Sequence, residues 1–544
     1  MRYIILFSFF IVANFSFSQS KKIQKILQQS EQLILDGEYQ VAILQLNKIL
    51  QKETLNMDAL FKRGICYDSL QKYPEALADY NQIIAFSSNT EVYKNRAKIR
   101  YKNGEILEGI LDFEKYLKAN PNDSESYFEI GNGYYALDNY SKALGYYSKA
   151  IEINPNFSEA HNPMGFCNAE MQNFQAAIAN FSKAIEISVN DELAYYNRGR
   201  SKIELKDFKG AISDFNKAIE INPEFAFAYH NRGLSKHELA DYNGAIIDYS
   251  IAISKGSEYL SESYSNRGRA KYNLKDYQGA LEDNTMAIQL NPNFANAYNN
   301  RGLSKYAMAD YNGSILDFSK ALEIDPSFSL AYNNRGLSKY ELGDFRGSIS
   351  DYTKAIEINP NLSIAYNNRG ILKNELNDFQ GAMNDITKAI ELNVDYSNAY
   401  YNRGITNAKI ENFKAAIVDN TKAIELDSIF AAAYVNRGLN KHDLKDFKGA
   451  IMDFNKGIEL DPNVALSFNN RAITKIELKE YVGAMSDCNK AIELDPNYAN
   501  AFFNRGLIKM LQGDKKGACL DWNRAIELKL DNPEAISFMR KECR

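Results

Sequence analysis

The sequence predicts an all-α array of about fifteen helical hairpins, and three observations lead to this prediction. The first is a repeat, because the triplet Asn-Arg-Gly recurs with a period of about 34 residues over much of the chain. The second is that apolar residues within each unit recur every three to four positions, which is the period of an amphipathic helix. The third is the placing of proline, since eight of the eleven prolines stand where one unit ends.

The first eighteen residues differ from the repeats that follow. Arg2 gives a positive start, residues 4–17 are mostly apolar, and Ser16-Phe17-Ser18 offers a small-residue cleavage site. We therefore expect residues 1–18 to be a signal peptide, with an uncleaved anchor as the alternative. No cysteine lies near the cleavage point, as a lipoprotein would require, and no later segment approaches the roughly 20 apolar residues of a transmembrane helix. The chain is expected to be exported, either periplasmic or secreted.

The repeat has a clear register. Successive arginines are evenly spaced except for the step from Arg232 to Arg267, which is one residue longer and places the extra residue in a loop near 255–257. Residues 19–195 keep the register with more divergent repeats, residues 196–530 form the regular Asn-Arg-Gly repeats, and residues 531–544 are expected to be a C-terminal capping helix. The arginines of the regular units stand at positions 198, 232, 267, 301, 335, 369, 403, 437, 471 and 505.

One unit shows how a hairpin follows from the residues. Lys206-Asp207 is a turn whose Asp can cap the second helix, and Asn222-Pro223 ends the unit because proline cannot continue a helix. The stripe of the first helix consists of Tyr195, Arg198, Lys202 and Leu205. The stripe of the second helix consists of Phe208, Ala211, Phe215, Ala218 and Ile219.

The aromatic, Gly, Ala, aromatic, Ala and Pro positions of these units resemble the tetratricopeptide repeat family over nearly the whole chain after residue 20. The resemblance implies that the hairpins stack into a right-handed superhelical solenoid, and that their first helices line a concave groove for other proteins or peptides. Neighbour-to-neighbour stacking needs capped ends, and Asn532-Pro533 followed by Ala535 and Met539 predicts the terminal helix.

The arginine of the triplet lies on the buried stripe, where the family usually has an apolar residue. An aspartate stands sixteen residues after every such arginine, as in Arg198 with Asp214 and Arg335 with Asp351, whereas the units without arginine also lack the aspartate. We interpret these residues as structural ion pairs, with the lysine four residues after the arginine as a second cation. The alternative is a row of arginines that binds ligand carboxylates.

The residue before each arginine points away from the buried stripe and is asparagine throughout the regular repeats. Asparagine is a poor helix-interior residue, but its amide can pair with a peptide group whatever the side chain. The row is similar to the asparagine ladder of the O-linked N-acetylglucosamine transferase repeat domain, where the amides hold substrate polypeptide. We therefore predict a peptide-binding ladder; the alternative is that the amides bond to neighbouring helices or face water. Its rungs are Asn197, Asn231, Asn266, Asn300, Asn334, Asn368, Asn402, Asn436, Asn470 and Asn504.

The residues beside the ladder vary more than the rungs. The polar strip is extended by Asn299, Asn333 and Asn367, whereas positions such as Leu337 and Ile371 add apolar surface to the groove. Such a groove favours extended polypeptide segments as partners.

The cysteines and histidines do not indicate a site. The cysteines are odd in number and mostly far apart, so we expect small core residues; Cys519 and Cys543 are near enough to pair, but packed thiols are preferred. Only His230 and His237 share a helix, and we expect them to be hydrated groove residues rather than metal ligands.

Charge and motifs narrow the function. A net charge of -5, from 64 basic and 69 acidic residues, provides no basic field for nucleic acid. No glycine-rich phosphate loop occurs, and the carboxylates recur with the repeat, so no acid-base pair stands out. We predict a non-enzymatic protein-protein interaction scaffold of the cell envelope or secreted fraction, without catalytic residues, metal or cofactor. The alternative is a structural or self-assembling component of an envelope assembly complex, and the oligomeric state is open.

Overall fold

The computed structural model describes residues 20–256 and 258–543. The predicted signal peptide, residues 1–18, lies outside the described residues, as does Ser257 of the predicted extra-residue loop. The chain divides into two compact units, Met1–Ala270 and Lys271–Arg544. The division falls within one helix, α15, whereas the limits predicted above mark where the Asn-Arg-Gly pattern begins.

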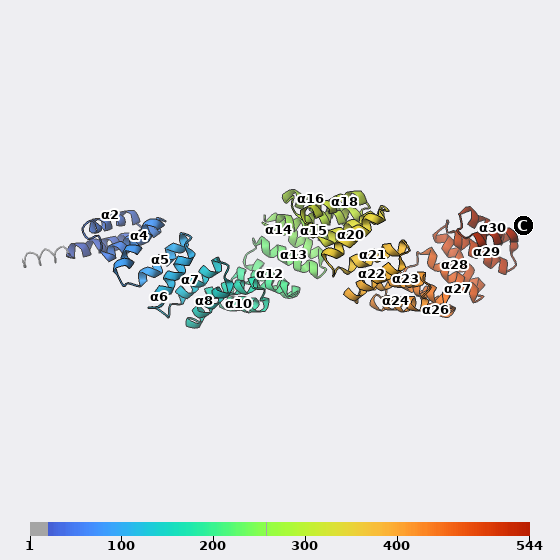
Figure 1. Cartoon of the computed structure of the whole chain (residues 1–544), viewed down its shortest axis with the longest axis horizontal. Coiled ribbons are helices and arrows are strands. Elements are labelled where there is room, and N and C mark those ends of the chain that lie inside the picture. Colours follow the sequence, from blue (N-terminus) through green and yellow to red (C-terminus); the bar gives the residue numbers. More distant parts are fainter. Residues whose placement is uncertain (1–19, 257, 544) are drawn as a thin grey trace, which may run out of the picture. The chain divides into compact units, whose positions relative to one another are not determined.

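The first unit is helical along nearly all of its described length (Figure 1). After a helical stretch over residues 20–35 it contains α2 (Tyr39–Leu50), α3 (Met57–Ser69), α4 (Tyr73–Phe86), α5 (Glu91–Lys102), α6 (Ile106–Leu117), α7 (Ser124–Ala136), α8 (Tyr140–Ile153), the short 3-10 helix η1 (Ser158–Ala160), α9 (His161–Glu170), α10 (Phe174–Ile187), α11 (Glu192–Glu204), α12 (Phe208–Ile221), α13 (Ala226–Glu238), α14 (Tyr242–Ser254) and most of α15 (Leu260–Asn273).

The second unit continues the same alternation of helices of nearly equal length and ends on a shorter one. It contains α16 (Tyr277–Leu290), α17 (Ala295–Ala307), α18 (Tyr311–Ile324), α19 (Ser329–Glu341), α20 (Phe345–Ile358), α21 (Ser363–Glu375), α22 (Phe379–Leu392), α23 (Ser397–Lys409), α24 (Phe413–Leu426), α25 (Ala431–Asp443), α26 (Phe447–Leu460), α27 (Ala465–Glu477), α28 (Tyr481–Leu494), α29 (Ala499–Leu511), α30 (Lys515–Glu527) and α31 (Pro533–Glu542).

The turn between the two helices of a hairpin is built as the sequence predicts. In the hairpin of α19 and α20, Gly343 adopts a positive φ of 77°, where the absence of a Cβ avoids strain. The next residue, Asp344, caps α20 by accepting a hydrogen bond from the backbone N–H of Gly347 at 2.9 Å. The hairpin ends at Asn359-Pro360, where proline removes the next backbone donor.

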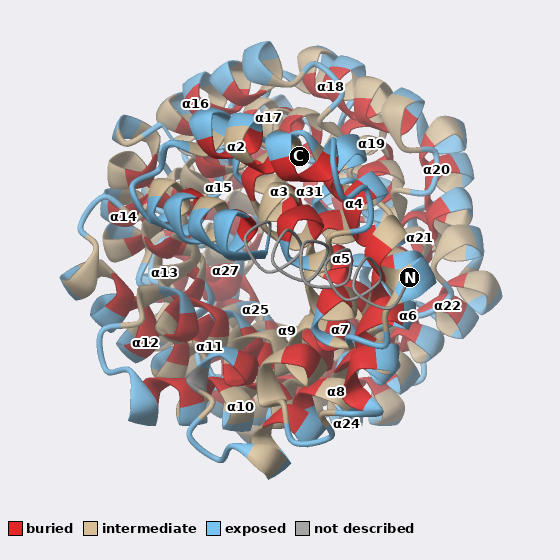
Figure 2. Ribbon diagram, turned by 90° about the vertical axis from the view of Figure 1, so that its left-hand side faces the viewer, coloured by how far each residue is buried: buried red, intermediate tan, exposed pale blue. Residues whose placement is uncertain are grey.

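Small residues let the two helices of a hairpin approach closely. A Cβ on Gly336 would lie 2.7 Å from the ring of Tyr352, so only glycine leaves room for this aromatic side chain. Ala331 and Ala355 are fully buried in the same hairpin. Within the second unit, α17, α19 and α21 form the inner side of the stack and α18, α20 and α22 the outer side (Figure 2).

The C-terminal helix α31 covers the last hairpin. Its first turn is capped by Asn532, whose side chain accepts from the backbone N–H of Ala535, and Met539 packs in a cluster with the buried Trp522. Cys519 of α30 and Cys543 at the end of α31 form a disulfide, so the expectation of packed thiols at these positions is wrong. The end of α31 folds back onto α30, with the two Cα atoms 5.6 Å apart, which the separation along the sequence did not reveal.

The predicted fold class is confirmed. The described residues contain helices and no strand, the helices pair into hairpins that pack on their neighbours, and a capping helix closes the C-terminal end. Within the same residues, no helix combines the length and the apolar character that crossing a bilayer requires.

Candidate functional site: the inner face of the first helices

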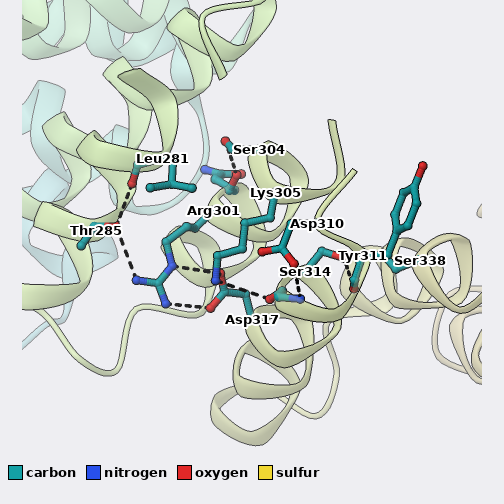
Figure 3. A network of polar contacts seen from close by, with 12 residues as sticks. Leu281, Thr285, Arg301, Ser304, Lys305, Asp310, Tyr311, Ser314, Asp317 and Ser338 are labelled. Carbon is teal, nitrogen blue, oxygen red and sulfur yellow. Dashed lines mark hydrogen bonds and ion pairs between the residues drawn. The ribbon is translucent and has the colours of Figure 1, made fainter. Parts of the chain in front are cut away.

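Most arginines of the triplet lie in a clamp that consists of an aspartate, a lysine and a hydroxyl or amide group, as shown around Arg301 in Figure 3. Its guanidinium donates from Nε to Asp317 Oδ2 at 2.9 Å and from Nη2 to Asp317 Oδ1 at 2.7 Å. Lys305 Nζ lies 2.8 Å from the same carboxylate, and Arg301 Nη1 reaches Thr285 Oγ1 on α16 at 3.5 Å. The clamp therefore joins both helices of one hairpin to the second helix of the preceding hairpin.

The pairs singled out from the sequence have this geometry. Arg198 donates to Asp214 at 3.0 and 2.7 Å, and Arg335 donates to Asp351 at 2.8 and 2.7 Å. The hydrogen bond to Asp351 raises the pKa of Arg335 above its ordinary value. Because these guanidinium groups already bind a carboxylate with two nitrogens, they are poorly placed to bind another from a ligand.

The sequence reasoning missed the third partner of the clamp. A serine, threonine or asparagine stands sixteen residues before most of the arginines and accepts from Nη1, as Ser319 does from Arg335 at 3.1 Å. The signal was present, because the hydroxyl or amide recurs in step with the repeat. Other acceptors of this kind are Asn47, Ser182, Asn216, Thr353, Thr387, Thr421, Asn455 and Asn489.

The ladder asparagines lie on the first helices, and most are half-buried. Asn197, Asn470 and Asn504 are buried, whereas Asn231, Asn266, Asn300, Asn334, Asn368, Asn402 and Asn436 keep part of their surface exposed.

In the second unit, four rungs bond to the preceding repeat. Asn334, Asn368 and Asn402 each donate from Nδ2 at 3.0 Å to the Oδ1 of an asparagine 35 residues earlier, and Asn504 does so at 2.8 Å. The acceptors are the residues beside the ladder, Asn299, Asn333, Asn367 and Asn469. The alternative of local bonding is thus realised at these rungs, but each bond uses only one of the two amide hydrogens.

The ladder is interrupted where the acceptor is missing. Tyr401 stands at the acceptor position for Asn436, and Val435 stands at the acceptor position for Asn470. Consequently the side-chain amide of Asn436 makes no hydrogen bond within the described residues, although its backbone carbonyl accepts one. For the same reason Nδ2 of Asn470 is buried without a partner. A pocket of about 160 Å³ opens beside Asn436, lined mainly by apolar residues that include Tyr401, Val435 and Leu439.

Apolar side chains flank the partly exposed rungs. Leu330 and Ile364 stand one helical turn before Asn334 and Asn368, and they are 46% and 37% exposed. Leu337 and Ile371 stand three residues after the same rungs and are partly exposed. Around Asn334 and Asn368, the inner face therefore offers amide groups with apolar side chains on both sides.

In the first unit, the rungs are engaged differently. Asn231 donates from Nδ2 to Tyr196 Oη at 3.2 Å and to the backbone carbonyl of Phe227 at 2.9 Å. Asn197 is buried, and its Nδ2 has no hydrogen-bond partner.

The histidines differ from expectation. His230 and His237 are buried, so the prediction that they are hydrated groove residues is wrong. His230 Nδ1 lies 2.7 Å from Ser263 Oγ, and burial lowers the pKa of His230 to about 4. Both histidines pack against an aromatic ring, His230 against Tyr249 and His237 against Tyr242.

Comparisons with known proteins agree with the geometry of the hairpins. One family model described as tetratricopeptide repeat matches residues 124–157, 193–225, 261–294 and 329–362; two further models with the same description match residues 295–328 and 431–464, and residues 58–89.

Two relatives found by sequence share only a small part of their length with this chain. The Hsp70-Hsp90 organizing protein of Triticum aestivum is 30% identical over 106 residues, which cover 19% of this chain and 17% of that protein. Hsp70-Hsp90 organizing protein 3 of Arabidopsis thaliana is 30% identical over 92 residues, 17% of this chain and 16% of that protein. The chain thus spans less than a fifth of these relatives. The crystal structure of the APC/C hetero-tetramer Cut9-Hcn1 matches 86% of this chain and 98% of that chain with 14% identity and a TM-score of 0.48. The chain is built from tetratricopeptide repeats, which typically mediate protein-protein interactions.

Proposed function

We propose that this chain is a non-enzymatic scaffold that binds extended polypeptide segments along the inner face of its first helices. The observation that carries the proposal is the row of half-buried asparagines on successive first helices, of which Asn334 and Asn368 have partly exposed apolar residues on either side. Amides pair with peptide groups irrespective of side chain, and the apolar residues near these rungs add contact area for side chains of many kinds. We therefore expect broad sequence tolerance.

The bonds between repeats leave capacity for a ligand. Asn334, Asn368 and Asn402 each retain one amide hydrogen, and Asn436 retains its whole amide next to the pocket lined by Tyr401 and Leu439. A bound segment would extend the rows of amide hydrogen bonds rather than replace them. The curated relatives are named for organising two other proteins, which supports protein binding as a class and no particular partner.

Asn436→Ala tests this function, because it removes a rung that makes no hydrogen bond of its own. A net hydrogen bond contributes on the order of 1 kcal/mol, so affinity for an unstructured peptide library should fall about fivefold. Asn384→Ala is the matched control, since Asn384 is an exposed asparagine on the outer helix α22. If both variants bind as wild type does, the inner face is not the binding site.

A second candidate function is assembly with copies of itself or with envelope components. Leu316, Val418 and Met452 occupy the same repeat position on second helices and are 71%, 67% and 72% exposed. Exposed apolar residues of this kind often mark interaction surfaces. A molecular mass that rises with concentration in light scattering, and that Met452→Lys lowers, would support this candidate.

The proposed setting is an oxidising compartment outside the cytoplasm, in the cell envelope or secreted fraction. The disulfide between Cys519 and Cys543 supports this proposal, because disulfides persist mainly in exported proteins. Cys66, Cys167 and Cys488 are buried free thiols. We expect the purified mature chain to begin near Gln19 and to show three thiols after denaturation without reductant; five thiols and an intact Met1 would contradict export.

A further inference from the structure

A second pocket lies in the first unit, between the helices α9, α10 and α11. It has a volume of about 470 Å³. Its walls include the rings of Phe166, Phe174 and Phe181, and its polar lining includes Glu170, Asn197 and Glu204. This pocket is distinct from the half-buried rungs of the second unit.

At this pocket, the hydrogen bond from a rung to the asparagine 35 residues earlier is not formed. Asn162 stands at the acceptor position for Asn197, but its amide donates to Asp191 Oδ2 at 2.6 Å. As a result, Oδ1 of Asn162 and Nδ2 of Asn197 are both buried without a partner. Asn197 is only 5% exposed, so this unsatisfied donor carries a real desolvation cost.

The charges at the pocket are unbalanced. Glu170 and Glu204 are exposed, stand one repeat apart at equivalent positions, and form no ion pair among the described residues. Arg200 also lines the pocket, but its guanidinium carbon lies 5.9 Å from the centre of the Tyr196 ring, which offers it a cation-π contact of its own. Two carboxylates against one guanidinium favour a cationic occupant.

We propose that this pocket binds a lysine or arginine side chain of an extended partner polypeptide. The alkyl stem packs on the rings of Phe166 and Phe174, and the cation pairs with Glu170 and Glu204. A carbonyl of the same segment accepts from Asn197 and satisfies its buried donor. The inference rests on the proposed function and adds a preference for basic residues at one place on the first unit.

The test uses the full mature chain and three unstructured peptides that differ only in one central residue. Arginine, its uncharged analogue citrulline, and glutamate occupy that position. A charged hydrogen bond is worth more than a neutral one, so we expect the arginine peptide to bind about tenfold more tightly than the citrulline peptide. The glutamate peptide should bind most weakly.

Substitutions assign this preference to the pocket. Glu170→Gln with Glu204→Gln should remove the advantage of the arginine peptide, and both residues are exposed, so the fold should be retained in circular dichroism. Glu477→Gln removes the same charge from the equivalent position of another repeat and should leave the advantage unchanged.

Three outcomes overturn the assignment. If all three peptides bind equally, the pocket has no charge preference, whereas the proposed polypeptide binding stands. If the glutamate peptide binds most tightly and Arg200→Gln removes that binding, the pocket takes an anion instead. If no peptide binds to the wild type, the proposed function and this inference both fail.

Discussion

Two hairpins of the same length hold their helices together in different ways. In the hairpin of α19 and α20, Arg335 and Lys339 both bind the buried carboxylate of Asp351. In the hairpin of α7 and α8, the equivalent positions carry the fully buried Ile130 and the aromatic Tyr146, whose ring stacks on Tyr134 with 5.4 Å between centroids. Both sequences place glycine beneath an aromatic ring and close the hairpin with similar turns.

The difference shows that the ion pair is one of two solutions to the same packing problem. A buried pair gains Coulomb attraction but loses hydration, so it contributes less net stability than its short distances suggest. The clamp also connects two hairpins, because Arg335 donates a hydrogen bond to Ser319 on the preceding hairpin. The apolar hairpin lacks this bond, although Tyr146 reaches back to Glu114 at 3.0 Å. The clamp therefore specifies how successive hairpins are aligned.

Breaking the clamp should have the largest effect. Arg335→Ile leaves the buried carboxylate of Asp351 without its partly exposed guanidinium partner, and we expect a loss of about 3 kcal/mol, near the lower end for buried pairs because Lys339 still faces Asp351. Adding Asp351→Tyr imitates the Ile130 and Tyr146 combination and should recover much of that loss. Hydrogen exchange of the local backbone is the suitable measurement, since a repeat array need not unfold in one step. If the loss of unfolding free energy in the double variant equals the sum of the losses in the two single variants, the pairing is not the reason why these residues change together.

The sequence predicts the ion pair of the clamp and the fold because both depend on residues that recur at fixed spacing, whereas the third partner of the clamp was missed. The repeat period brings Arg335 and Asp351 onto facing helices, and the apolar stripes predict the hairpins. The bonds of Asn334 were not predictable in the same way, since an amide can bond to water, to a ligand or to the next helix with equal chemistry. The burial of His230 and the disulfide of Cys543 depend on neighbours that the repeat does not specify.

Removing a bonded rung should have the next largest effect. Asn368→Ala leaves Oδ1 of Asn333, a residue only 1% exposed, without its donor, and we expect a loss of about 1–3 kcal/mol. Asn436→Ala is the matched comparison, because that amide makes no hydrogen bond within the described residues and alanine is the better helix former. Thermal or chemical unfolding of the two variants should therefore diverge; equal stability would mean that the bonds between rungs contribute nothing.

Repairing the interrupted ladder should have a smaller effect of opposite sign. Val435→Asn supplies an acceptor for the buried Nδ2 of Asn470, which now has none. Gly457→Ala belongs with Val435→Asn, because a Cβ at Gly457 would lie 2.7 Å from the Val435 side chain, whereas repeats with the asparagine carry alanine there. The double variant should gain about 1 kcal/mol in stability. If unfolding shows no gain while Asn368→Ala is destabilising, then the orphaned amide of Asn470 is satisfied in another way.

The smallest expected effect concerns pH, and it compares a clamp that has one cation with a clamp that has two. Asp79 faces Arg63 alone, because Tyr67 stands where the lysine usually is, and burial raises its pKa above 3.8 despite the hydrogen bond from Arg63. Burial also acts to raise the pKa of Asp521, but the hydrogen bonds from Arg505 and Lys509 outweigh it and lower that pKa below 3.8.

These directions have opposite consequences for stability. A carboxylate with a lowered folded pKa contributes stability above its unfolded pKa, and this contribution is lost as the pH falls through the folded pKa. Asp79 binds its proton more tightly when folded, so acidification through its folded pKa favours the folded hairpin. When the pH is lowered from neutral to below 3.8, the hairpin of α29 and α30 should therefore lose the stability that its clamp contributes, and its backbone amides should exchange faster. The hairpin of α3 and α4 should not lose stability from its clamp over the same range. Lys509→Met should raise the pKa of Asp521 in a carboxyl NMR titration, because it leaves Arg505 as the single cation; an unchanged pKa would mean that the second cation does not cause the difference.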